Sequence, residues 1–241
     1  MKILVIAAHP DDEILGMGGT IKKYTKSKNK VKIIILATGI LARRSNDFKN
    51  STKYDVKNSI KAKMLKQTKI LRQQAKQAGK ILGVSDIEFF DFPDNEMDTV
   101  SNLEITKTIE GVIEKFNPSI VYTHSSIDVN IDHKMIFNAT LTATRPKKNS
   151  SIEKVYSFEI PSSSEWNFSE SFNPNTFVDI EKELSYKIKA MEKYKSEVEK
   201  FPHPRSIMAL ESIAHRWGTV SGFNAAEAFT LIRDLKKNVD N

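Results

Sequence analysis

The chain has 241 residues, of which 39% are hydrophobic and 28% charged, with a formal net charge of +7 and no cysteine. This length suits one well-filled core, and we expect a single domain over residues 1–241. No stretch approaches the ~18 consecutive apolar residues of a membrane span. The lack of cysteine excludes disulfides and thiolate chemistry, so any metal must take nitrogen and oxygen ligands. A cytoplasmic location fits this composition.

The positive charge raises nucleic acid, membrane surfaces and anionic molecules as partners. Many lysines, however, fall in helix-like stretches such as Lys61–Lys80 and Lys182–Lys200, where they are interleaved with Gln or Glu. This pattern is typical of solvated helix faces. We therefore expect no nucleic acid and no membrane span, and the sequence leaves open whether the chain forms a homo-oligomer.

The first half of the chain alternates short apolar runs with helix-forming segments. Lys2–Ala8 and Lys30–Thr38 predict strands, and Ile14–Lys28 predicts a helix between them. A secretory signal is the alternative for Ile3–Ala8, but the run is too short and acidic residues follow at once. The alternation continues at Lys61–Leu82, Ile87–Phe92, Leu103–Phe116, Ser119–His124 and Lys134–Arg145. We therefore expect a Rossmann-like α/β fold, a mostly parallel sheet with helices on both faces.

After Ser150 the alternation weakens, and we expect a C-terminal α+β extension of the sheet. Long loops are predicted at Gly39–Ser59 and Phe201–Gly222. The remaining segments predict two strands followed by two helices, at Glu153–Ile160, Thr176–Ile180, Glu181–Glu199 and Ala225–Lys237.

The most informative residues follow the first predicted strand. His9 lies at its carboxyl end, where open parallel sheets bind ligands. Pro10 suits a first helical turn, so Asp11 and Asp12 lie near a helix N-terminus. Acidic residues there also complement the helix dipole, which is the structural alternative. Imidazole and carboxylate are nevertheless zinc ligands, and Asp11 is the natural base for activating a water.

The run Ala8–Glu13, followed by Gly16, Gly18 and Gly19, resembles the signature of the PIG-L/LmbE-like family of zinc-dependent N-deacetylases. The resemblance implies a Rossmann-like fold and removal of acetyl groups from N-acetylglucosaminyl substrates. It implies that His9 and Asp12 bind Zn²⁺ and that Asp11 is the general base, while Glu13 is structural. Fe²⁺ could occupy the same ligands.

A second element, Asp128–His133, follows the strand Ser119–His124. The resemblance implies that His133 is the third metal ligand and that Asp132 is the acid that pairs with a histidine. The commonest family pattern reads His-x-Asp-His, and its first histidine is credited with stabilising the tetrahedral intermediate and protonating the amine. This chain has Asn130 there. An amide can donate a hydrogen bond to an oxyanion but cannot supply a proton.

Three groups are candidates for the missing acid, namely His124, His203 and Asp11 itself. We favour His203, because Phe201–Ser206 resembles a motif in a branch of the family found with sugar and polysaccharide biosynthesis. A turn stiffened by two prolines is the structural alternative. The branch resemblance extends over Asp128–His133, Thr144–Pro146, Ser163–Trp166 and Ala226–Phe229. We expect His215 to be structural.

Substrate-binding residues are predicted from the same resemblance. Asp94 lies in a stretch similar to the family's Pro-Asp-x-x-Met, whose aspartate contacts sugar hydroxyls, although a Pro-Asp-Asn turn is the competing explanation. Arg44 occupies a loop where family members place an arginine against the substrate. Arg145 and Arg205 would favour an anionic group such as a nucleotide diphosphate. Trp166 could stack on a sugar or belong to the core.

We therefore predict metal-dependent hydrolysis of the N-acetyl group of a GlcNAc-type amino sugar, nucleotide-linked or glycan-linked, with release of acetate. One alternative substrate is a GlcNAc-malate-type thiol precursor. Another alternative is a catalytically weakened metal- and sugar-binding protein, in which Asn130 records loss of the acid. A nucleotide-binding Rossmann protein is disfavoured, because Gly16, Gly18 and Gly19 fall a helical turn past the first strand.

Overall fold

The computed structural model describes residues 1–39 and 58–236. Its centre is a seven-stranded sheet in the order β3-β2-β1-β4-β5-β7-β6. Five strands pair in parallel, namely β1 (Lys2–Ala7), β2 (Lys30–Ala37), β3 (Asp86–Phe92), β4 (Ile120–His124) and β5 (Lys154–Phe158). The strands β7 (Ala226–Asp234) and β6 (Thr176–Asp179) extend this sheet in antiparallel fashion. The predicted α/β fold with a C-terminal extension is confirmed.

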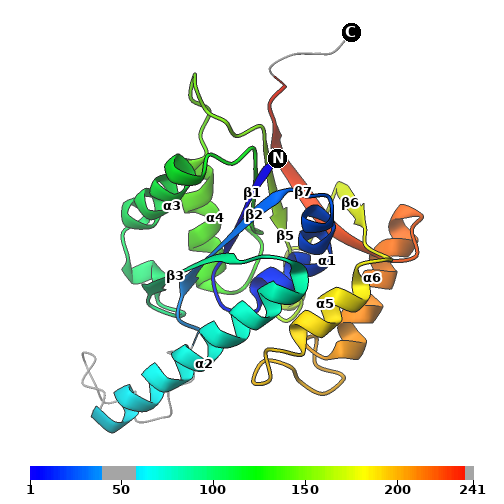
Figure 1. The fold of residues 1–241 in the computed structure, drawn as a ribbon, viewed down its shortest axis with the longest axis horizontal. Coiled ribbons are helices and arrows are strands. Elements are labelled where there is room, and N and C mark those ends of the chain that lie inside the picture. Colours follow the sequence, from blue (N-terminus) through cyan, green and yellow to red (C-terminus); the bar gives the residue numbers. More distant parts are fainter. Residues whose placement is uncertain (40–57, 237–241) are drawn as a thin grey trace.

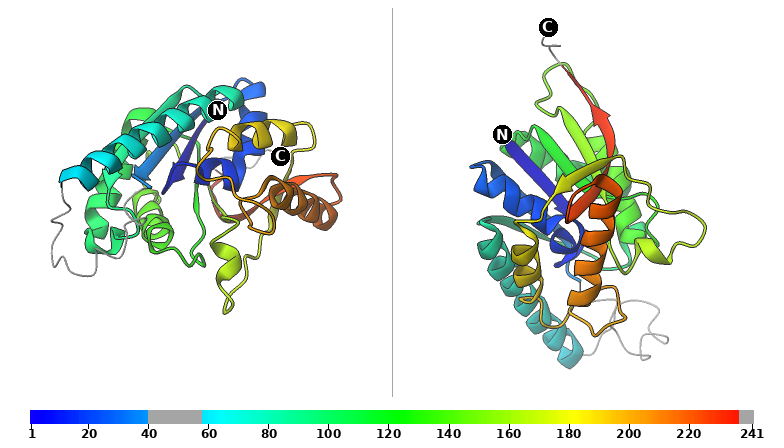
Figure 2. Two further views of the ribbon diagram at one scale, coloured as in Figure 1. Left: turned by 90° about the horizontal axis from the view of Figure 1, so that it is seen from below. Right: turned by 90° about the vertical axis from the view of Figure 1, so that its right-hand side faces the viewer.

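Helices cover both faces of the sheet (Figures 1 and 2). On one face, α3 (Asn102–Phe116) and α4 (Ile131–Ala143) pack over Leu4 and Ile6 of β1. The other face, which carries Ile3 and Val5, is covered by α1 (Asp12–Lys26), α2 (Asn58–Leu82) and α5 (Leu184–Met191). Because successive side chains of a strand point to opposite faces, one apolar run fills both halves of the core.

The C-terminal third differs from the prediction in three elements. The predicted helix Ala225–Lys237 is instead the strand β7, because it lies between β5 and β6 and this tertiary pairing overrides its helix-forming alanines. The predicted loop Phe201–Gly222 contains α6 (Ile207–Ser221), which ends at Gly222 with φ 77°. The predicted helix Glu181–Glu199 is wrong in length, because α5 spans only its middle part.

The glycines after the first strand let α1 approach the C-terminal extension closely. A Cβ at Gly16 would lie 2.4 Å from Phe158, and one at Gly19 would lie 2.9 Å from Ile180. The helix is kinked at Met17, and the freed N–H groups of Gly19 and Thr20 donate to the Glu227 carboxylate at 2.9 and 2.6 Å. The glycine pattern is therefore explained by packing.

Lys187 on α5 completes this contact, because its ammonium lies 2.7 Å from Glu227 and the carboxylate is buried. A buried carboxylate needs such partners. These contacts fix the start of α1 against the sheet. Within residues 1–39 and 58–236, the helices are too short or too polar to cross a bilayer.

Candidate metal centre

The candidate site lies where β1 and β4 end at the same edge of the sheet. After β1 the chain passes through His9 into α1, whose first residue is Asp12. After β4 it passes into α4, and His133 lies in the first turn of that helix. Asp12 and His133 are buried, and the His9 side chain is 13% exposed. Two strand-to-helix connections thus bring two histidines and a carboxylate together.

The three predicted ligands form a nearly equilateral arrangement. The distances between His9 Nδ1, Asp12 Oδ2 and His133 Nε2 are each 3.3 Å. The donor atoms of a tetrahedral zinc site, with bonds of ~2.0–2.1 Å, lie about 3.3 Å apart. In addition, Asp12 Oδ1 is buried with no hydrogen-bond partner among the described residues. The residues therefore fit zinc in both donor type and spacing.

Each histidine has a carboxylate at its other ring nitrogen. His133 Nδ1 lies 2.8 Å from Asp128 Oδ2, and Asp128 also accepts hydrogen bonds from the hydroxyls of Ser163 and Ser164. His9 Nε2 lies 2.9 Å from Asp132 Oδ2. Such carboxylates orient the rings of metal-binding histidines and raise their basicity.

Two other clusters among the described residues could hold a metal, and each shares a histidine with the first. The cluster of His9, Asp94 and Asp132 is disfavoured, because both Asp132 oxygens accept backbone N–H groups, from Asn95 at 2.6 Å and Met97 at 3.0 Å, whereas only one Asp12 oxygen does so. The cluster containing His124 and Asp128 is disfavoured, because His124 Nε2 already accepts the Ala8 N–H at 2.8 Å.

Asp11 stands beside these ligands in an unusual backbone conformation. Its φ is 118°, a region that non-glycine residues rarely occupy, and strain of this kind concentrates at functional sites. Its carboxylate is buried, and Oδ2 lies 3.2 Å from the Arg205 guanidinium. Burial raises the pKa of Asp11 well above its ordinary value, against the opposing charge of Arg205. Glu13 holds this turn, since it accepts hydrogen bonds from Asp11 N and the Tyr194 hydroxyl.

A cavity of about 170 Å³ opens beside the ligands. Asn130 caps α4 through its Oδ1, which accepts the Asp132 N–H at 2.9 Å, so the side-chain amide group remains as a donor. Asp94 lies 3.0 Å from His9 Nε2 and is buried. The cavity is lined by His9, Pro10, Asp11, Gly39, Asp94, Asn95, Asn130, Glu197 and Arg205.

The structure does not bring every predicted residue to this cavity. Arg145 follows the far end of α4, pairs with Glu110 at 3.0 Å and lines a separate cavity. Arg44 lies outside the described residues. His203 lines a neighbouring cavity, where its Nδ1 accepts the Arg205 N–H at 3.1 Å.

The remaining histidines have structural surroundings. His124 is fully buried and stacks on His133 with ring centroids 3.9 Å apart. Burial holds the pKa of His124 well below its ordinary value, so it cannot serve as an acid near neutral pH. His215 is on the surface of α6 and contacts the Asn224 carbonyl.

One contributor was not anticipated from the sequence. Glu197 lines the cavity and lies 3.1 Å from Arg205, which thereby joins two carboxylates, Asp11 and Glu197. No local pattern marks Glu197, because it lies in a lysine-rich stretch that otherwise reads as a solvated helix. Only its burial distinguishes it from neighbouring glutamates.

Comparison with known proteins agrees with this geometry. Residues 4–144, which contain all three candidate ligands, match the family described as PIG-L, GlcNAc-PI de-N-acetylase. The chain belongs to this family. The resemblance seen in the sequence is thereby confirmed.

Curated relatives carry related descriptions. The chain is 27% identical to the diacetylchitobiose deacetylase of Thermococcus kodakarensis over 238 residues, covering 96% of this chain and 83% of that protein. It is 26% identical over 132 residues to a probable N-acetyl-alpha-D-glucosaminyl L-malate deacetylase 2 of Bacillus anthracis, covering 54% of each. The longer match spans the C-terminal extension as well as the metal ligands.

Solved structures share the fold. The N,N'-diacetylchitobiose deacetylase of Pyrococcus horikoshii has a TM-score of 0.73 at 21% identity, covering 96% of this chain and 84% of that one. GalB, a 4-carboxy-2-hydroxymuconate hydratase of Pseudomonas putida, has a TM-score of 0.72 at 20% identity, covering 100% and 98%. Since a deacetylase and a hydratase share this architecture, the reaction must be argued from the site and not from the fold.

Proposed function

We propose that the protein is a metal-dependent N-deacetylase that hydrolyses the N-acetyl group of a GlcNAc-type amino sugar. The observation that carries this proposal is the triangle of His9, Asp12 and His133, whose His9 lines the same cavity as the Asp11 carboxylate. The deacetylase descriptions of the curated relatives support the same reaction.

Zinc is the proposed ion, and Fe²⁺ suits the same nitrogen and oxygen donors. When bound, it would polarise the acetamide carbonyl and make water a stronger nucleophile. His9, Asp12 and His133 would hold it. Asp132 and Asp128 would fix the two imidazole rings through their outer nitrogens.

The chain's own residues account for the proton transfers. Asp11 takes a proton from water as the oxygen attacks the carbonyl carbon, and the C–N bond then breaks. The amide group of Asn130, which lines the cavity, can donate a hydrogen bond to the oxygen that becomes negative. The leaving nitrogen must receive a proton, so that acetate and a free amine are formed.

Asp11 is the group best placed to return that proton. It lines the cavity that contains His9, whereas His203 lies in the neighbouring cavity and His124 is sealed beneath His133. A single carboxylate then serves as base and afterwards as acid. This assignment replaces our sequence-based preference for His203.

The substrate assignment rests on fewer contacts. Asp94 lines the cavity and can accept hydrogen bonds from sugar hydroxyls. Arg205 also lines it, but its charge is already opposed by Asp11 and Glu197. A phosphate or carboxylate on the substrate therefore gains little from Arg205, which favours an uncharged amino sugar.

Acetate release by the zinc-loaded protein tests the proposal. N-acetylglucosamine, N,N'-diacetylchitobiose, UDP-GlcNAc and GlcNAc-malate would each be assayed. Asp11→Asn should keep bound zinc and lower kcat by about 10²–10⁴-fold, because the base is lost while the ligands remain. In the same assay, His203→Gln should lower kcat on N-acetylglucosamine by less than about tenfold, since the proton comes from Asp11.

Asp91→Asn is a matched control, because Asp91 is an exposed aspartate that pairs with Arg72 and does not line the cavity. Full activity in Asp11→Asn would refute the mechanism. If no substrate releases acetate although sugar and zinc bind, the chain is instead a metal- and sugar-binding protein.

A further inference from the structure

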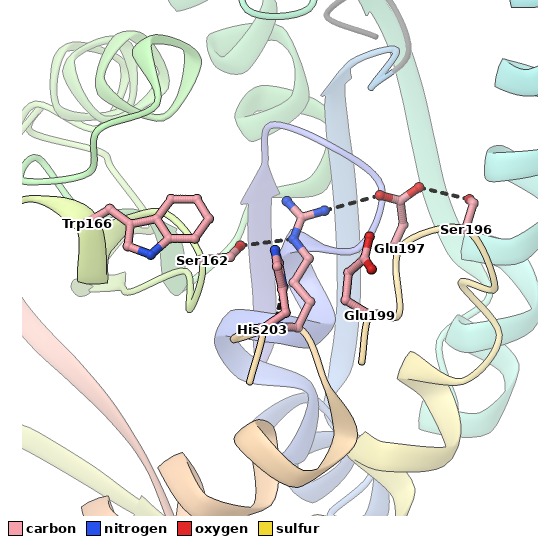
Figure 3. Close-up of a pocket in the computed structure, with 7 residues that line it drawn as sticks. Ser162, Trp166, Ser196, Glu197, Glu199 and His203 are labelled. Atoms are coloured by element: carbon pink, nitrogen blue, oxygen red, sulfur yellow. Dashed lines mark hydrogen bonds and ion pairs between the residues drawn. The ribbon is translucent and has the colours of Figure 1, made fainter. Parts of the chain in front are cut away.

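Figure 3 shows a second cavity, of about 400 Å³. It shares two lining residues with the cavity beside the candidate metal ligands. It is formed by three segments from the C-terminal half of the chain, those around Ser162–Trp166, Ser196–Glu199 and His203–Arg205. Its lining residues are Ser162, Trp166, Ser196, Glu197, Glu199, His203 and Arg205. Apart from Glu197 and Arg205, which also line the first cavity, none of these residues has a role in the mechanism proposed above.

The two sides of this cavity differ in chemistry. On one side stands Trp166, from the short helix η4 (Ser164–Trp166), and its indole is 48% exposed. His203 holds the indole edge-on, with ring centroids 6.0 Å apart. Figure 3 shows Glu197 and Glu199 across from Trp166. A cavity with an aromatic ring on one side and carboxylates on the other suits a pyranose, whose apolar face packs on a ring while its hydroxyls donate hydrogen bonds.

The two cavities share a wall. Arg205 and Glu197 line both of them, and Arg205 is held there by Asp11, Glu197 and the Ser162 hydroxyl, at 3.2, 3.1 and 2.9 Å. The second cavity therefore lies directly next to the one beside Asp11, on the other side of Arg205 and Glu197. Convergent polar groups around an open cavity are typical of small-molecule subsites.

The charges in this cavity disfavour anions. Two carboxylates, Glu197 and Glu199, line it, and its single arginine is already engaged by Glu197 and Asp11. Like charges within a few ångströms repel, so a diphosphate or a dicarboxylate would be opposed. A neutral sugar meets no such cost.

We infer that the cavity between Trp166 and Glu199 is a subsite for an uncharged pyranose linked to the sugar that is deacetylated. The inference rests on the proposed function and narrows its substrate class to short oligosaccharides. It assigns Trp166 as a stacking residue and Glu199 as the residue that discriminates against anionic substituents.

The test compares kcat/KM for N,N'-diacetylchitobiose with kcat/KM for N-acetylglucosamine in each variant. Trp166→Ala should lower this ratio by about tenfold, and Trp166→Phe should restore most of it, because a smaller ring still offers a face. Phe168→Ala is the matched control, since Phe168 is 95% exposed, lies two residues from Trp166 and does not line the cavity. It should leave the ratio at the wild-type value.

Charge selection is tested with UDP-GlcNAc as the anionic substrate. Glu199→Gln should raise its kcat/KM relative to diacetylchitobiose by about threefold, a small change because Glu199 is exposed to solvent. The same substitution at Glu192, an exposed glutamate just after α5 that does not line the cavity, should have no such effect.

Calorimetric binding of both sugars to the zinc-loaded Asp11→Asn protein separates this inference from the catalytic proposal. Suppose that the wild-type protein releases no acetate, but that Trp166→Ala weakens binding of the disaccharide more than binding of N-acetylglucosamine. The subsite is then supported, and the deacetylase proposal fails. The inference would be overturned if Trp166→Ala left the preference for disaccharide over N-acetylglucosamine unchanged in both kcat/KM and binding. It would also be overturned if the wild-type protein preferred UDP-GlcNAc to the disaccharide.

Discussion

The chemistry of the candidate site depends on residues in pairs, a ligand and the carboxylate behind it. In the proposed centre, His133 would bind the metal through Nε2, and Asp128 contacts its Nδ1 at 2.8 Å. The same arrangement joins His9 to Asp132. Loss of a backing carboxylate should therefore weaken metal binding without removing a ligand.

Asp128→Asn tests this pairing. We expect zinc affinity, measured by competition with a chromogenic chelator, to fall by about 10–100-fold, because the amide no longer raises the basicity of the His133 ring. Asp91→Asn, at an exposed ion pair, should retain wild-type affinity. An unchanged dissociation constant in Asp128→Asn would show that Asp128 does not act through His133.

At the scale of single residues, much of the site could be predicted from the sequence. His9, Asp11 and Asp12 are adjacent, and they follow an apolar run whose strand character is plain. The link from Arg205 to Asp11 could not be predicted, because it joins segments that only the folded chain brings together. For the same reason the position of Arg145, at the opposite end of α4 from His133, was not foreseen.

At the level of elements, a half-buried carboxylate joins the end of β5 to α6. Glu159, just after β5, accepts a hydrogen bond from the Trp217 indole N–H of α6 at 2.6 Å. Burial raises the pKa of Glu159 from 4.5 to about 7, against the hydrogen bond from Trp217. The protonated form is therefore favoured by folding.

The sign of the pH effect follows from this raised pKa. The contribution of Glu159 to stability is complete below its unfolded pKa of 4.5 and is lost as the pH rises through about 7. Glu159→Gln cannot ionise and keeps an acceptor for Trp217. Between about pH 5 and pH 8, the unfolding free energy of the wild type should fall by up to ~3 kcal/mol more than that of Glu159→Gln, as measured by urea titration. The exposed control Glu192→Gln should show the same pH dependence of unfolding free energy as the wild type. If Glu159→Gln also showed the wild-type pH dependence, the assignment to Glu159 would be wrong.

Element prediction succeeded where local pattern and tertiary environment agree. The strands β1, β2, β4 and β5 are largely buried on both faces and read as apolar runs. It failed at β7, where alanine, glutamate and leucine favour a helix but the gap between β5 and β6 requires a strand. The prediction missed α6 because Pro202 and Pro204 favour a loop just before it. The helix begins after them, at the N-cap Ser206, whose hydroxyl accepts the Ala209 N–H.

At the scale of the whole molecule, the site is assembled from both halves of the chain. The parallel half provides the candidate metal ligands, and the C-terminal extension provides Arg205, Glu197 and the second cavity. Glu227 and Lys187 couple the two halves by fixing α1 to β7 and α5. The candidate metal ligands and the proposed sugar subsite therefore lie in different parts of one fold, and we expect the range of substrates to vary while the metal ligands are retained.

The central claim is that His9, Asp12 and His133 hold one metal ion. A crystal structure of the zinc-loaded protein, with anomalous data on both sides of the zinc edge, tests it most directly. We predict a single peak within bonding distance of His9 Nδ1, Asp12 Oδ2 and His133 Nε2, at about 2.0–2.2 Å from each. A peak among His9, Asp94 and Asp132, or one beside His124 and Asp128, would contradict the account, as would the absence of any peak in this cavity.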